Sequence, residues 1–126
     1  MKGVRVLVCG DRNWTDRASL FQALAILDTT VDEVITTIIE GTASGADTMA
    51  GEWADQTGIE HLRFPAQWGK YGKAAGPIRN QQMLDEGKPE LVVYFHPDLA
   101  NSRGTGDMVR RATKAGIKVI NGMELL

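Results

Sequence analysis

Stretches typical of buried strands alternate with stretches typical of amphipathic helices along the whole chain. Five apolar runs, most of them rich in β-branched residues, predict strands at 4–9, 34–39, 59–64, 91–95 and 117–120. The segments between them have helical spacing: one helix follows a capping Thr15 or Asp16, and others cover 46–57, 77–87 and the segment before Gly116. Strands separated by single helices predict a parallel sheet with helices on both faces. We therefore expect one α/β domain, residues 1–126, with a doubly wound parallel sheet of about five strands.

Length and composition narrow the class of protein. A chain of 126 residues is long enough for one independent core. Its net charge of −2 argues against a dedicated nucleic-acid binder, which usually carries a strongly basic face. The single cysteine, Cys9, permits no internal disulfide, and we expect it to be a packing residue in a reducing cytoplasm. The sequence shows no run long enough to span a membrane and no signal-peptide pattern, so a cytoplasmic protein is predicted.

Unusual polar and glycine residues gather in the loops that follow the predicted strands. Ligands of doubly wound sheets bind outside the carboxyl ends of the strands, where the strand order reverses. The candidate ligand-binding residues come from four such loops: Gly10, Asp11 and Arg12; Gly41, Ser44, Gly45 and Asp47; Gly76, Arg79 and Asn80; and Arg103, Gly104 and Thr105.

Two of these loops lead directly into helices, at Gly45 and at Gly104–Thr105. A helix N-terminus carries unsatisfied N–H donors and partial positive charge, so both suit a phosphate. Arg79 and Arg103 are the candidates for neutralising that phosphate. Asp47 lies in the first turn of its helix, where a carboxylate also simply stabilises the helix dipole, and both interpretations stay open.

Several familiar signatures are absent. No G-x-G-x-x-G follows the first strand, and no P-loop motif occurs, which disfavours a dinucleotide enzyme or a P-loop NTPase. His61 and His96 are isolated in the sequence, and no cluster of Cys and His has metal-ligand spacing. We expect no metal and no cofactor.

The loop motifs together resemble the YspA/YpsA-related branch of the SLOG superfamily, from Val4 to Ile120. The resemblance rests on four segments in order, at 10–12, 45–47, 75–80 and 103–105, of which Gly-Pro-Ile-Arg-Asn at 76–80 is the most discriminating. It implies a Rossmann-like fold that binds nucleotides or nucleotide-derived ligands. The wider superfamily includes the Lonely guy phosphoribohydrolases, which cleave the base from a nucleoside monophosphate, and the single-stranded DNA-binding DNA-processing protein A.

Two loops depart from the patterns of these families. Thr42 and Ser44 stand where the branch commonly has glycine and arginine. In the fourth loop Asp107 comes one residue earlier than the phosphoribohydrolase glutamate, and Met108 occupies that position. One residue on a helix turns a side chain by about 100°.

The leading hypothesis is a nucleotide-binding or nucleotide-sensing protein, in which Asn80 and Asp11 contact the sugar or base. The alternative is an enzyme that cleaves the N-glycosidic bond of a nucleotide, with Asp47 or Asp107 as its catalytic carboxylate. A third hypothesis is single-stranded nucleic-acid binding through residues 70–79. The acidic composition makes nucleic acid a less expected partner than a nucleotide. A fourth is a partner-binding module of a phage or its host. Pairing with a second copy is common for such domains, and the sequence leaves it open.

Overall fold

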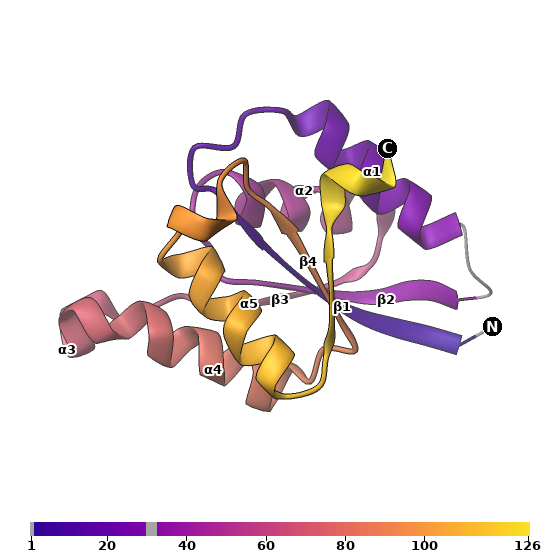
Figure 1. The fold of residues 1–126 in the computed structure, drawn as a ribbon. Coiled ribbons are helices and arrows are strands. Elements are labelled where there is room, and N and C mark those ends of the chain that lie inside the picture. Colours follow the sequence, from indigo (N-terminus) through magenta and orange to yellow (C-terminus); the bar gives the residue numbers. More distant parts are fainter. Residues whose placement is uncertain (1, 30–32) are drawn as a thin grey trace.

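In the computed structural model, which describes residues 2–29 and 33–126, the chain forms one five-stranded sheet (Figure 1). Each strand pairs in parallel with its neighbours. The strands are β1 (Lys2–Gly10), β2 (Glu33–Glu40), β3 (Glu60–Arg63), β4 (Leu91–Phe95) and β5 (Lys118–Asn121). Their order is β3-β2-β1-β4-β5. The predicted doubly wound parallel sheet is confirmed.

Helices cover both faces of this sheet. The α-helices are α1 (Arg17–Thr29), α2 (Ala46–Thr57), α3 (Trp68–Tyr71), α4 (Ala75–Gly87) and α5 (Gly104–Lys114). The described residues also form three short 3-10 helices, η1 (Gly72–Ala74), η2 (Leu99–Asn101) and η3 (Gly122–Leu125). As Figure 1 shows, α1 and α2 lie on one side of the sheet, and α4 and α5 lie on the other. Within the described residues, no helix is long and apolar enough to cross a membrane.

The alternation of side chains along β1 explains why both faces are covered. Val6 and Val8 point into the core under α1 and α2, whereas Leu7 and Cys9 point into the core under α4 and α5. All four are buried. Burying an aliphatic side chain of this size contributes about 1.5–3 kcal/mol, so a strand apolar on both faces is stable only at the centre of a two-sided sheet.

Most element ends lie where their local signals predict, and one region differs. Asp16 caps α1 by accepting a hydrogen bond from the Ser19 N–H at 3.0 Å, and Gly58 ends α2 in the left-handed conformation. The stretch 65–76, expected to be a loop, instead contains α3 and η1. As a result α4 begins at Ala75, and Pro77 is its third residue rather than its first. Proline is tolerated there because the N–H groups of a first helical turn have no intrahelical acceptor.

The chain reverses its direction of winding at β1. The segments up to β3 add strands on one side of β1, and β4 and β5 then add strands on the other side. The crossovers diverge from the boundary between β1 and β4, which leaves the carboxyl ends of these two strands uncovered by a helix. The loops after β1, β2 and β4 therefore meet at one edge of the sheet.

Candidate functional site

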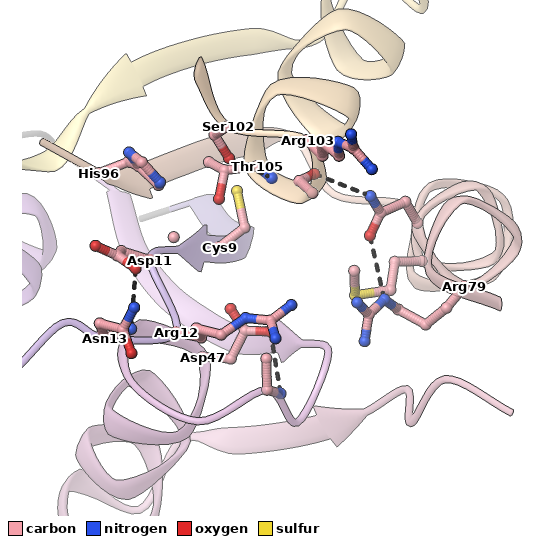
Figure 2. A pocket seen from close by; sticks show the side chains of 15 residues that line it. Cys9, Asp11, Arg12, Asn13, Asp47, Arg79, His96, Ser102, Arg103 and Thr105 are labelled. Atoms are coloured by element: carbon pink, nitrogen blue, oxygen red, sulfur yellow. Dashed lines mark hydrogen bonds between the residues drawn. The ribbon is translucent and has the colours of Figure 1, made fainter. Parts of the chain in front are cut away.

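A cavity of about 280 Å³ lies at this edge, outside the carboxyl ends of β1 and β4 (Figure 2). Its volume is near the lower end of the range of small-molecule sites, about 300–1,000 Å³. Its lining residues come from all four predicted loops and from the strand ends beneath them: Cys9, Gly10, Asp11, Arg12, Asn13, Ala43, Asp47, Arg79, Asn80, Met83, His96, Ser102, Arg103, Gly104 and Thr105.

Backbone hydrogen bonds hold the first loop in place. The Asp11 N–H donates to the Phe95 carbonyl at 2.9 Å, and the Asp11 carbonyl accepts from the Ala46 N–H at 3.2 Å. A Cβ on Gly10 would lie 2.3 Å from the Phe95 carbonyl oxygen, so only glycine permits this approach. The loop is thus tied to β4 on one side and to α2 on the other, and it presents Asp11 and Arg12 to the cavity.

The second loop satisfies its own donors. The Asp47 carboxylate accepts hydrogen bonds from the N–H groups of Gly41 at 3.2 Å and Ala43 at 3.4 Å. Burial raises the pKa of this carboxyl from 3.8 to about 7; Arg79 opposes the rise and Glu40 adds to it. Because a carboxylate already occupies the concave side of the turn, this loop is a poorer phosphate site than its sequence indicates.

The two glycines of the second loop serve packing. Gly45 has φ 81, and a Cβ there would lie 2.3 Å from the Asp11 carbonyl oxygen. A Cβ on Gly41 would lie 2.4 Å from the Arg79 guanidinium. Neither glycine lines the cavity, and neither does Ser44, whose hydroxyl donates to the Arg12 carbonyl at 3.2 Å. These three predicted binding residues therefore contact residues that line the cavity, and they do not line it themselves.

Thr42 adopts a backbone conformation that favours glycine, with φ 65. The resemblance described in the sequence analysis implies a glycine at this position. The Thr42 side chain is exposed, so no packing contact in the core demands a threonine there.

The predicted third-loop residues Arg79 and Asn80 lie in α4, where they form a chain of hydrogen bonds across the cavity wall. The Arg79 guanidinium donates to the carbonyls of Gly41 and Phe64, and its Nε donates to the Asn80 Oδ1 at 3.1 Å. The Asn80 Nδ2 in turn donates to the Gly104 carbonyl at 3.2 Å. Both side chains line the cavity, but their polar atoms already join the second loop to α4 and α5 (Figure 2).

Two other predicted residues lie outside the lining. Gly76 faces the Trp68 ring, which a Cβ would approach to 3.3 Å. The Asp107 carboxylate accepts from the Asn80 Nδ2 at 3.0 Å and from the Arg111 Nε at 2.8 Å. A carboxylate held in this way fastens α4 to α5 and does not face the cavity.

The fourth loop brings the N-terminus of α5 to the cavity. The Ser102 hydroxyl accepts from the Thr105 N–H at 3.1 Å, which caps the first turn of α5. A Cβ added to Gly104 would meet no atom within 4 Å, so this glycine faces free space. The guanidinium groups of Arg12 and Arg103 are exposed, and neither makes a hydrogen bond or ion pair within the part of the chain that the structure describes.

Sequence reasoning missed six lining residues: Cys9, Asn13, Ala43, Met83, His96 and Ser102. His96 follows β4 directly, and this position after a strand could have identified it as a candidate cavity residue. Its Nδ1 accepts from the Asp98 N–H at 2.9 Å, so in the neutral ring the proton lies on Nε2. Cys9 forms part of the floor, and burial raises the pKa of its thiol, so it is not a ready nucleophile.

His61 lies away from the cavity, between two acids. Its Nε2 is 2.6 Å from a Glu40 carboxylate oxygen, and its Nδ1 is 3.2 Å from an Asp55 oxygen. These contacts join β3 to β2 and α2, so His61 is explained by packing within the domain.

The fold and the cavity define a Rossmann-like α/β protein with an open pocket at the switch point of its sheet. Residues 4–71 match the model of the YspA, cpYpsA-related SLOG family, and the chain belongs to this family. It is 35% identical over 127 residues to the Gene 61 protein of Mycobacterium phage D29, covering 93% of this chain and 94% of that protein. The resemblance inferred from the four loop motifs is thereby confirmed.

One solved structure shares the fold. DNA processing protein A (DprA) from Streptococcus pneumoniae superposes with a TM-score of 0.55 at 17% identity, over 98% of this chain and 63% of that one. UDP-GlcNAc 2-epimerase from Neisseria meningitidis, bound to UDP-GlcNAc, gives a TM-score of 0.48 at 16% identity, over 96% of this chain and 32% of the enzyme. This chain therefore spans less than two thirds of either protein.

Proposed function

We propose that the cavity binds a nucleotide or a nucleotide-derived ligand, with a phosphate at the N-terminus of α5. The observation that carries this proposal is a pair of exposed arginines, Arg12 and Arg103, whose guanidiniums have no hydrogen-bond or ion-pair partner within the described residues. Both line the same cavity as Gly104 and Thr105 at the N-terminus of α5. An anion there receives charge-assisted hydrogen bonds as well as the favourable helix dipole. Membership of the SLOG family supports a nucleotide-related function.

The structure supports α5 over α2 as the phosphate site. At α2 the Asp47 carboxylate already accepts the N–H groups of its loop, and it would repel a second anion when ionised. At α5, Gly104 leaves space for close approach of a ligand to the backbone. The sugar and base would then extend toward Asp11 and His96, across the floor formed by Cys9.

Isothermal titration calorimetry against a panel of nucleoside mono-, di- and triphosphates, cyclic nucleotides and ADP-ribose tests the proposal. Losing one charge-assisted contact costs about 1.5–3 kcal/mol, so we expect Arg103→Ala or Arg12→Ala to weaken binding about 10- to 100-fold. Lys114→Ala is the matched control, because it removes one exposed cation from the opposite end of α5. Absence of binding at millimolar ligand, or equal losses in all three variants, would contradict the proposal.

A second candidate function, hydrolysis of an N-glycosidic bond, is favoured by one observation. Asp47 is a cavity-wall carboxyl whose pKa is raised to about 7, which suits a general acid at neutral pH. Since Asp107 is turned away from the cavity, the hypothesis narrows to Asp47. Chromatography should then detect free base from the wild type, and Asp47→Asn should bind the nucleotide without releasing base. If the wild type leaves every nucleotide of the panel intact, this candidate fails.

Single-stranded nucleic-acid binding through residues 70–79 stays a hypothesis. It predicts an affinity that falls steeply with salt concentration, which fluorescence anisotropy with a labelled oligonucleotide would measure.

A further inference from the structure

Apolar side chains are concentrated on the outside of α3 and α4. Among the described residues, five large hydrophobic side chains are exposed, and three of them belong to this segment: Trp68 (56% exposed), Tyr71 (39%) and Ile78 (43%). Figure 1 shows α3 projecting past the body of the domain as an extension of α4. Contiguous exposed apolar surface on a soluble domain commonly marks an interaction site.

Tyr71 and Ile78 lie along one stripe of the surface, formed by residues of α3, η1 and α4. A surface hollow of about 610 Å³ runs beside them, and its lining includes Tyr71, Ala74, Ile78, Gln82 and Asp85. Ala74, Ile78, Gln82 and Asp85 are three or four residues apart along η1 and α4, the spacing at which side chains share one face of a helical segment. Tyr71 lies before them in α3, across the break in the helix at Gly72. Such a stripe is suited to pack against another helix.

Charge along the stripe is arranged from one end to the other. Lys70 and Lys73 lie in the N-terminal part of the segment, and Asp85 and Glu86 lie in its C-terminal part. All four residues are exposed. The Lys70 Nζ is 5.0 Å from the centre of the Tyr71 ring, so this ammonium borders the apolar stripe. A parallel copy of the segment would place like charges together, whereas an antiparallel copy places each basic end beside an acidic end.

We propose that this face, residues 68–86, pairs antiparallel with the same face of a second copy of the chain, about a two-fold axis near Ile78. In this arrangement the basic end of the face, with Lys70 and Lys73, would lie beside the acidic end of the second copy's face, with Asp85 and Glu86. An isologous interface must be complementary to itself, and the two ends of this segment meet that condition.

Sedimentation equilibrium from about 1 to 500 µM tests the pairing. The wild type should show a monomer–dimer equilibrium, and Ile78→Asp, which buries a charge on the axis, should raise the dimer dissociation constant at least 30-fold. Leu126→Asp is the matched control, because it places the same charge on an exposed apolar residue outside the stripe. A monomeric wild type throughout this range overturns the proposal, as does a dimer that Ile78→Asp leaves unchanged.

Charge reversal tests the antiparallel geometry. Lys70→Glu/Lys73→Glu and Asp85→Lys/Glu86→Lys should each weaken self-association about 10-fold or more, because each puts like charges at both ends of the interface. An equimolar mixture of the two variants should form a heterodimer at least as tight as the wild-type dimer. Weakened variants that fail to rescue each other would refute the antiparallel pairing, and so would assembly of this face with a different protein only.

Discussion

Replacing Asp47 by asparagine tests the electrostatics of the second loop. The substitution keeps the shape of the side chain and an oxygen that accepts from the Gly41 and Ala43 N–H groups, but it removes the ionisation. The carboxyl is 5% exposed, and its pKa is raised from 3.8 to about 7 by burial. At about 1.4 kcal/mol for each pH unit, ionising this group in the native state costs about 4 kcal/mol.

The sign of the effect follows from where the proton is bound. Between pH 4 and pH 7 the native state holds the Asp47 proton and the unfolded state does not, so the wild type loses stability as the pH rises through this window. The asparagine variant has no such loss. We therefore expect the free energy of unfolding of Asp47→Asn, minus that of the wild type, to rise by about 3 kcal/mol from pH 5 to pH 8.

Urea denaturation of both proteins at pH 5.0, 6.5 and 8.0 measures this difference in the free energy of unfolding. Taking the difference cancels the contributions of the titratable groups that both proteins share. Asp98→Asn is the control for removing one exposed negative charge, and its effect should vary by less than about 0.5 kcal/mol over the same range. If the Asp47→Asn difference is constant with pH, or falls, then Asp47 is ionised throughout and burial does not control it.

Five further substitutions, at four positions around the cavity, are to be compared with the wild type by chemical denaturation. Thr42→Gly should raise the free energy of unfolding by about 0.5–1 kcal/mol, because left-handed backbone costs a side chain about 1–2 kcal/mol and glycine recovers most of it. Gly45→Ala should cost at least about 2 kcal/mol, since its Cβ would lie 2.3 Å from a backbone oxygen at φ 81, whereas Gly104→Ala should stay within about 1 kcal/mol of the wild type. Asn80→Ala should cost about 1–3 kcal/mol through lost hydrogen bonds, and Asn80→Asp should cost more, because its carboxylate would oppose that of Asp107. Equal stability of Gly45→Ala and Gly104→Ala would contradict the close approach of Gly45 to the first loop. Equal stability of Asn80→Ala and Asn80→Asp would contradict the contact between Asn80 and Asp107.

The predictability of the candidate site differed between its first loop and its second loop. Gly10, Asp11 and Arg12 were predictable because parallel strands end at one edge of a sheet, so the residue type and its position after a strand suffice. Gly41 and Gly45 carry the same local signal, yet they face Arg79 and the first loop rather than the cavity. Which side of a turn faces the cavity depends on packing partners that are distant in the sequence.

The sequence by itself determined the alternating strands and helices, their parallel arrangement and the edge where polar loops gather, because these follow from periodicity and from backbone geometry. Only the tertiary structure decided how charge is distributed there. It buries Asp47 against its own loop and holds Arg79 against backbone carbonyls, while Arg12 and Arg103 stay exposed. The physical reason is that the strength of an anion site depends on which donors other protein groups already occupy, and those groups meet only when the chain is folded.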